Sequence, residues 1–287
     1  MSESIHPQTS IGTVSLAVAD LERSLGFYED VIGLQRHRQE GNTAYLGAGG
    51  PDLLQLTEKP GARPVAGTTG LYHFAILVPS RRHLAQSLRR LLETNTLGGF
   101  SDHLVSEALY LSDPDGNGIE IYRDRPRATW SYREGRLQMA TDPLDVHNLM
   151  AEVAGEDAPW QGLAPGTTIG HIHLQVAHIG QAEAFYSDVL GFDLTTRYGT
   201  AASFLSAGGY HHHIGINTWE SQGAPPPPAD ATGLRWYTIQ LPTQEALDAV
   251  VARLWQAHIS PEQRDEGIYV EDPAQNGIVL THATPPA

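Results

Sequence analysis

The chain has 287 residues, a formal net charge of −15 and no cysteine. That length suits two domains of ordinary size, each large enough to bury its own core. The acidic balance argues against nucleic acids and anionic membranes as partners, because both are negatively charged. Without cysteine, disulfides and thiolate metal sites are excluded, so the 14 histidines and the carboxylates are the available metal ligands.

The N-terminus and the hydropathy pattern bear on location. The opening residues M-S-E-S-I-H-P-Q lack the basic and apolar segments of a signal peptide. No run approaches the ~18 apolar residues that a membrane-spanning helix needs. We therefore expect a cytoplasmic protein with no membrane partner.

The sequence repeats itself at a nearly constant offset. F-Y-E-D-V-I-G-L (27–34) returns as F-Y-S-D-V-L-G-F (185–192), and D-P-D-G-N-G-I (113–119) returns as D-P-A-Q-N-G-I (272–278). Such self-similarity indicates two copies of one design. We expect the first half over residues 9–125 and the second over 167–285. Between them, residues 126–166 form a linker with a short helix that starts at Asp142-Pro143 and stops at Gly155.

Each half contains the same unit twice. In the first quarter, a strand over 13–18 precedes a helix with an apolar face and a glycine stop, followed by strands over 43–46 and 53–57; the helix positions are Leu21, Leu25, Tyr28, Ile32 and Gly33. In the second, a strand over 72–78 precedes a helix and strands over 108–111 and 118–122; this helix is lined by Leu84, Leu88, Leu91 and Leu92. Quarters three (169–219) and four (233–283) repeat the order. The fold class is therefore α+β, built from four β-α-β-β-β modules.

Four such modules with a D-P-x-G-N-x-x-E turn resemble the vicinal oxygen chelate superfamily of glyoxalases, bleomycin-resistance proteins and extradiol ring-cleaving dioxygenases. The resemblance covers nearly the whole chain except the linker, and the arrangement is most similar to bacterial two-domain catechol 2,3-dioxygenases. It implies two open cup-shaped β-sheet barrels, each made of two modules. It also implies a metal bound by side chains from the first and last strands of the paired modules.

Three residues match the positions of the metal ligands. His73 lies in the first strand of module two, Glu120 in the last strand of that module, and His171 in the first strand of module three. A carboxylate on the cup interior needs a compensating cation, which a metal provides. The resemblance assigns these residues as the two-histidine, one-carboxylate triad of non-haem Fe(II) oxygenases. His173 shares the strand face of His171, so it is either the alternative ligand or a substrate-binding residue.

The distribution of these ligands predicts how the modules pair. Module four has Trp236 and Val279 where ligands are expected, and module one has Thr13 and Gln55. A complete triad therefore requires modules two and three in one cup, with one and four in the other. The alternative is a one-plus-two cup that lacks its third ligand, or that a second chain completes in a homo-oligomer.

The resemblance also implies a substrate shell. Tyr110 stands ten residues before Glu120, at the spacing of a tyrosine that hydrogen-bonds near the bound substrate, and His103 precedes it by seven. Within G-G-Y-H-H-H-I-G-I-N, His213 aligns with the acid–base catalyst. Strand alternation then puts His211 on its face as a possible substrate contact, with His212 pointing away. Gly215 takes the position where glyoxalases place a ligating glutamate.

These features predict an extradiol dioxygenase that opens a catechol-type ring with O2 at Fe(II), with Mn(II) as the other candidate metal. In this reading His213 and Tyr110 are catalytic. Two other functions stay open. A glyoxalase-type lyase or isomerase requires a carboxylate from both paired modules, and Gly215 removes one. A metal-free binding or resistance protein does not require the triad.

Overall fold

The computed structural model describes residues 4–156 and 158–282. Module one contains β1 (Ser10–Val18), α1 (Leu21–Gly26) continued by a π-helical turn (Phe27–Ile32), β2 (Gln35–Glu40), β3 (Thr43–Gly47) and β4 (Asp52–Glu58). Module two contains β5 (Gly70–Leu77), α2 (Arg81–Glu93), β6 (Gly99–Asp102), β7 (Ser106–Ser112) and β8 (Gly118–Asp124). Residues 283–285 of the expected second half lie outside the described residues.

The second half repeats this order. Module three contains β11 (Thr168–Gln175), α4 (Ile179–Ala184) with a π-helical turn (Phe185–Val189), β12 (Asp193–Tyr198), β13 (Ala202–Ser206) and β14 (Ile214–Asn217). Module four contains β15 (Gly233–Leu241), α5 (Gln244–Gln256), β16 (Glu262–Arg264), β17 (Gly267–Glu271) and β18 (Gly277–His282). The unit β-α-β-β-β thus occurs four times, as predicted.

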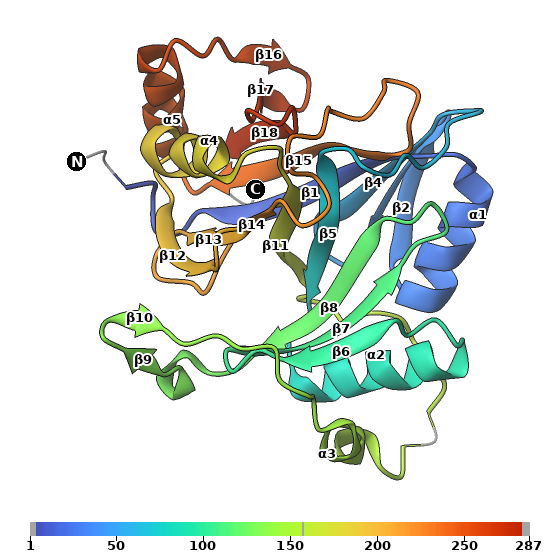
Figure 1. The fold of residues 1–287 in the computed structure, drawn as a ribbon. Helices are drawn as coiled ribbons and strands as arrows, with labels where there is room; N and C mark the ends of the chain where they lie inside the picture. The colour runs from blue at the N-terminus through green and yellow to red at the C-terminus, as the bar shows by residue number, and fades with distance from the viewer. Residues whose placement is uncertain (1–3, 157, 283–287) are drawn as a thin grey trace.

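The strands form two eight-stranded curled sheets, each of which joins modules from different halves of the chain (Figure 1). One sheet has the order β16-β17-β18-β15-β1-β4-β3-β2, and the other has β12-β13-β14-β11-β5-β8-β7-β6. The antiparallel pairs β1–β15 and β5–β11 make the joins. The predicted pairing of module two with three and of one with four is therefore confirmed, and the one-plus-two alternative is wrong.

The same hydrogen bonds stabilise the D-P turn in both halves of the chain. The Asp113 carboxylate accepts hydrogen bonds from the backbone N–H groups of Asp115 and Asn117 and from the hydroxyl of Tyr28 in module one. Asp272 and Tyr186 repeat the contact in the second half. Buried carboxylates with several donors are well satisfied. These bonds fix the start of β8, which carries Glu120 two residues after its first residue.

The linker differs in detail from the prediction. Its helix, α3, spans Val146–Met150, and the side chain of Asp145, not of Asp142, caps it by accepting from the N–H of Asn148. A short hairpin of β9 (Tyr132–Arg133) and β10 (Arg136–Leu137) precedes it. Segment 137–141 passes over the concave side of the module two and three sheet, where it lines a pocket.

Other differences have simple physical causes. β2 has six exposed residues, and β6 is only four residues long, so neither gives an apolar pattern. Leu92, predicted to line the helix, is 51% exposed and lies outside the core.

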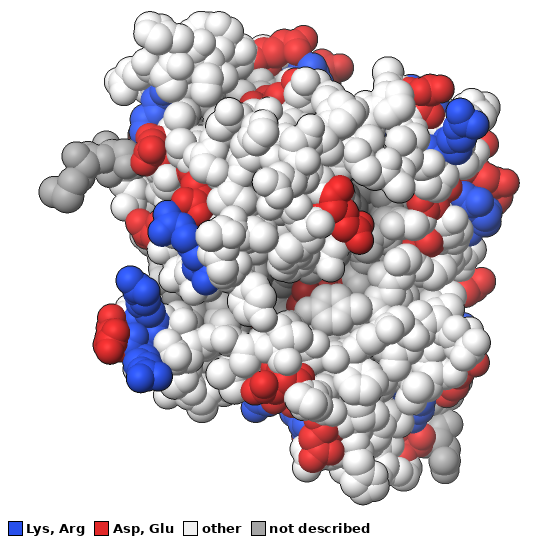
Figure 2. All heavy atoms as spheres, in the orientation of Figure 1, with Lys and Arg blue, Asp and Glu red and all other residues white. Residues whose placement is uncertain are grey.

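No helix in the described part of the chain has both the length and the apolar character needed to cross a membrane. Figure 2 shows the Lys and Arg side chains of one face scattered among Asp and Glu.

Candidate metal centre and substrate pocket

The strand register brings the three predicted ligands together. His73 of β5 lies opposite His173 of β11, which places His171 opposite Ala75. Ala75 is in turn the parallel partner of Glu120 in β8. The side chains therefore project from three adjacent strands on one side of the sheet. Oε2 of Glu120 lies 3.1 Å from Nε2 of His73 and 3.2 Å from Nε2 of His171.

This cluster has the chemistry of a metal site. One ligand atom from each residue lies within 4.8 Å of the others, and all three side chains are buried. Nε2 of His73, although close to the carboxylate, makes no hydrogen bond among the described residues. Two imidazoles and one carboxylate form a donor set that divalent transition metals prefer. All three ligands come from one chain, so a second chain is not needed to complete the set.

The electrostatics of the cluster favour the ligating protonation states. Burial lowers the pKa of His171 to about 4, so its imidazole is neutral near pH 7. Burial alone would raise the pKa of Glu120, but the neighbouring His171 and His73 hold that pKa well below its ordinary value. A neutral imidazole and an ionised carboxylate each offer a lone pair to a metal.

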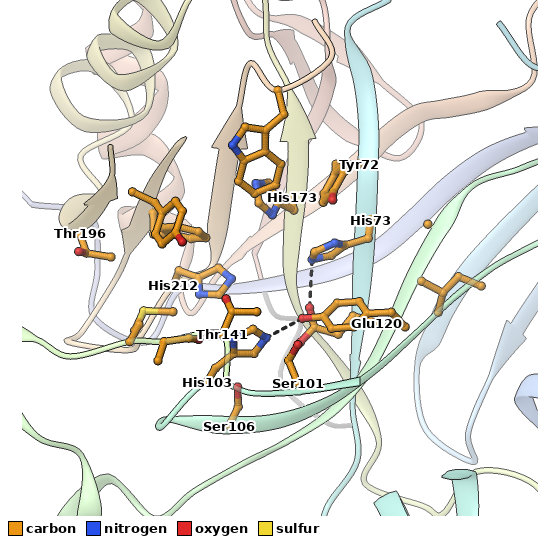
Figure 3. A pocket seen from close by; sticks show the side chains of 18 of the residues that line it. Tyr72, His73, Ser101, His103, Ser106, Glu120, Thr141, His173, Thr196 and His212 are labelled. Atoms are coloured by element: carbon orange, nitrogen blue, oxygen red, sulfur yellow. Dashed lines mark hydrogen bonds and ion pairs between the residues drawn. The ribbon is translucent and has the colours of Figure 1, made fainter. Parts of the chain in front are cut away.

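A cavity of about 620 Å³ opens beside the cluster, and Figure 3 shows the rings of His73, His103, His173 and His212 directed toward it. Cavities of 300–1,000 Å³ commonly bury small organic ligands. Its lining includes the predicted ligands His73 and Glu120, aromatic side chains from modules two and three, and the linker segment 137–141. The cluster is therefore a candidate metal centre beside a ligand-sized cavity.

His103 and Tyr110, both predicted in the substrate shell, line this cavity in direct contact. Nδ1 of His103 lies 2.6 Å from the carbonyl oxygen of Ala140, and a carbonyl can only accept, so Nδ1 carries the proton. In the neutral ring Nε2 is then an acceptor, and the Tyr110 hydroxyl, 2.7 Å away, donates to it. Burial raises the pKa of Tyr110 well above its usual range, so the phenol keeps its proton.

His173 also lines the cavity and packs against His73, with the two ring centroids 5.0 Å apart. Its ring packs among Tyr72, Phe204 and Trp219, with centroids 5.0 to 5.6 Å away. Its Nε2 is buried and has no hydrogen-bond partner among the described residues. Burial lowers the pKa of His173 well below its usual range, so the ring is neutral. The cluster of mutually close ligand atoms contains His171 and not His173.

The three consecutive histidines do not lie as alternation predicted. β14 begins only at Ile214, so residues 211–213 are not in a strand and the alternation argument does not reach them. His212 lines the cavity, with its ring centroid 4.1 Å from that of His171. His213 is outside the cavity lining, packs on Tyr210, and accepts a hydrogen bond at Nδ1 from the N–H of Ala207.

His211 is likewise not in the cavity, contrary to its predicted substrate contact. It is fully buried behind His212 and bonded to Asp124. The sequence contains a signal for the irregular backbone, because Gly208 and Gly209 precede the run with one residue between, Tyr210, and both adopt positive φ. Such a glycine pair marks a turn, and strand alternation starts only after it.

Comparison with known proteins agrees with this architecture. A model of the Glyoxalase/Bleomycin resistance protein/Dioxygenase superfamily matches residues 10–121 and 168–280. The chain is 49% identical over 281 residues to a catechol-2,3-dioxygenase of Bacillus subtilis (strain 168), which spans 96% of this chain and 98% of that protein. The chain therefore belongs to the Glyoxalase/Bleomycin resistance protein/Dioxygenase superfamily, as its modules indicated.

Solved structures share the fold at low sequence identity. A putative dioxygenase from Bacillus subtilis subsp. subtilis str. 168 superposes with a TM-score of 0.64 at 15% identity, covering 100% of this chain and 87% of that one. Glyoxalase I from Zea mays gives 0.58 at 16% identity, covering 95% and 92%. These similarities concern the arrangement of the modules and not the chemistry.

Proposed function

We propose that this protein is an extradiol dioxygenase of the catechol 2,3-dioxygenase type, which opens a catechol-type ring beside its diol with O2. The main support is the 49% identity, across 96% of the chain, to an enzyme of that name. The cluster of His73, Glu120 and His171 at the base of a cavity supports it, since such triads with open positions are typical of non-haem Fe(II) oxygenases.

We propose Fe(II) as the metal, held by His73, Glu120 and His171. When bound, it would supply open coordination positions for the diol and O2. Mn(II) has overlapping ligand preferences and is the other candidate. No nucleic acid or membrane is needed for this chemistry, and we place the enzyme in the cytoplasm. A homo-oligomer is compatible with a site complete in one chain.

The cavity side chains supply proton transfer and orientation. His212 is the side chain that we assign to take the proton of a catechol hydroxyl, in place of His213, because His212 lines the cavity beside His171. The Tyr110 hydroxyl donates its proton to His103, so its oxygen can accept a hydrogen bond from a catechol hydroxyl. The buried Nε2 of His173, which has no partner among the described residues, can donate to a substrate oxygen in the tautomer that is protonated there. The product would be a 2-hydroxymuconic semialdehyde type of compound.

The cavity wall favours apolar substituents on the ring. Tyr72, Phe204 and Trp219 form an aromatic wall beyond the metal ligands. The one Lys or Arg in the described lining is Arg197, and its guanidinium already pairs with Glu183 at 2.7 Å. A carboxylated catechol would therefore enter without a free cation to balance it.

One experiment separates this function from its alternatives. The protein is loaded anaerobically with Fe(II) or Mn(II), its metal content is measured, and oxygen uptake is followed on addition of catechol. Stoichiometric metal with oxygen uptake and a yellow product is the expected result. Bound metal without uptake for any catechol favours a glyoxalase-type lyase or isomerase. Failure to bind metal favours a metal-free binding protein.

A further inference from the structure

A continuous line of hydrogen bonds leads from the cavity into the protein. Nδ1 of His212 lies 2.9 Å from Nδ1 of His211. Nε2 of His211 lies 2.9 Å from Oδ1 of Asp124, the last residue of β8. The His211 side chain is 1% exposed and that of Asp124 is 27% exposed. Only His212 of the three lines the cavity.

The acceptor at the far end determines where the protons lie. An ionised carboxylate can only accept, so Nε2 of His211 carries a proton. In a neutral imidazole the other nitrogen is then an acceptor, which makes Nδ1 of His211 the acceptor of its bond with His212. His212 must therefore donate from Nδ1. Its proton is fixed there, and Nε2 keeps a free lone pair.

We infer that Asp124 and His211 are positioning residues, which hold His212 in the tautomer whose Nε2 lone pair can accept a proton from a catechol hydroxyl. This inference rests on the proposed function for its substrate. The arrangement of protons itself does not depend on that function. A neutral histidine without such partners is free to exchange its proton between the two nitrogens, and one tautomer cannot act as a base at the cavity.

Asp124 is itself held by Tyr210, whose hydroxyl also contacts that of Tyr122. The Tyr210 hydroxyl donates to both oxygens of Asp124, at 3.1 and 2.9 Å, and the hydroxyls of Tyr210 and Tyr122 are 2.7 Å apart. Gly170, directly before the ligand His171, leaves space that the Tyr122 hydroxyl occupies, since any side chain there would collide with it. The absence of a side chain at Gly170 thus leaves room for the Tyr122 hydroxyl. That hydroxyl contacts Tyr210, which in turn bonds to Asp124.

The first measurement reads the tautomer directly. The ¹⁵N chemical shifts of histidine ring nitrogens distinguish a protonated from an unprotonated nitrogen, and the signals of His212 are assigned by their loss in His212→Asn. In the full-length metal-free wild-type protein we expect Nδ1 protonated and Nε2 unprotonated. In Asp124→Asn, the amide can donate to Nε2 of His211, and the pattern in His212 inverts. A wild-type His212 protonated at Nε2 overturns the inference.

The second measurement reads catalysis in the Fe(II)-loaded enzyme. We expect Asp124→Asn to lower kcat by about 10²-fold or more, the scale of general acid–base catalysis, while KM for catechol and metal content change little. In serine proteases the same carboxylate-to-amide exchange acts through the wrong tautomer. Asp124→Glu keeps the anion and should recover part of kcat. Asp30→Asn, on an exposed carboxylate remote from the cavity, is the matched control.

The outcomes separate the inference from the proposed function. If Asp124→Asn leaves kcat intact, or if it lowers kcat only in proportion to lost metal or lost folded protein, Asp124 has a structural role and the inference fails. If the wild-type enzyme oxidises no catechol, the proposed function fails. The tautomer measurement still decides the proton arrangement in that case, because it needs neither metal nor substrate.

Discussion

Oε2 of Glu120 lies 3.2 Å from Nε2 of His171, although 51 residues separate them in the chain. The contact crosses from module two to module three through β5, whose strand neighbours are β8 and β11. The candidate metal centre thus depends on the join between two sequence repeats. Either half of the chain alone would lack part of the triad.

Glu120→Gln tests this centre directly. The amide keeps the size of the side chain but removes the anion that two buried histidines face, and it is a poorer ligand. We expect metal content after anaerobic loading to fall at least about tenfold, the scale at which even outer-shell changes act. Elemental analysis of the purified protein measures it. Glu93→Gln, on the exposed end of α2, should retain full loading. Normal metal content in Glu120→Gln would show that this carboxylate is not a ligand.

The exchange of roles between His212 and His213 gives a paired test. Asparagine can mimic the Nδ1 side of histidine, so His212→Asn can still donate to His211 and His213→Asn can still accept from Ala207. We expect His212→Asn to bind metal but to lose about 10²-fold or more in kcat. His213→Asn should stay within a few-fold of wild type. The opposite result would restore the role predicted from sequence for His213.

How far the sequence could predict this site depends on the regularity of the backbone. Within the strands, the family resemblance assigned His73, Glu120 and His171, and regular strand pairing brings their side chains together as that assignment requires. The segment between β13 and β14 is irregular, and the three histidines at 211–213 lie in it. The alternation of strand side chains therefore does not predict the directions of their side chains. The sequence did not identify Asp124 as a site residue, although Asp124 follows Glu120 by four residues and so shares its strand face. Its partner His211 comes from another module, and sequence alone does not place those two side chains in contact.

Gly215 is predicted to be required for space as well as for an open coordination position. A Cβ atom at this residue would lie 2.9 Å from Cγ of His173, closer than side chains normally approach. Gly215→Ala should therefore displace the His173 ring and lower kcat/KM, while the triad still binds metal. Steady-state kinetics and metal analysis measure the two effects. Gly26→Ala, where an added Cβ meets nothing within 4 Å, should leave both unchanged. Wild-type kinetics in Gly215→Ala would contradict this role.

Glu107 is predicted to be a major source of stability outside the site. It is 2% exposed and forms ion pairs with Arg81 of α2, with Arg123 of β8 and with Arg125. Burial would raise the pKa of Glu107, but the arginines hold it below its ordinary value. We expect Glu107→Gln to lower the free energy of unfolding by about 3 kcal/mol at pH 7, because three guanidinium groups lose their anion.

The pH dependence of this difference has a definite sign. A carboxyl group with a lowered folded-state pKa stabilises the protein above its unfolded pKa, and that contribution is lost as the pH falls through the folded value. Denaturant unfolding of wild type and Glu107→Gln should therefore converge at acidic pH. Glu262→Gln, whose side chain is 63% exposed, should change stability little at any pH. A constant difference across the acidic range would show that the charge of Glu107 is not responsible.

Substituted catechols test the character of the cavity wall. Because the aromatic side chains of Tyr72, Phe204 and Trp219 face a substituent while Arg197 is already paired, transfer of an alkyl group from water is favourable and that of a carboxylate is not. We expect kcat/KM for an alkylcatechol to exceed that for a carboxylated catechol by about 10-fold or more, since one unbalanced polar group costs at least about 1–3 kcal/mol. Trp219→Ala should narrow the ratio by weakening alkylcatechol binding. Glu183→Gln removes the carboxylate that pairs with Arg197. It should also reduce the ratio, by raising kcat/KM for the carboxylated catechol. A wild-type enzyme that prefers the carboxylated catechol would show that the cavity contains a usable cation, and Arg197 would then be its source.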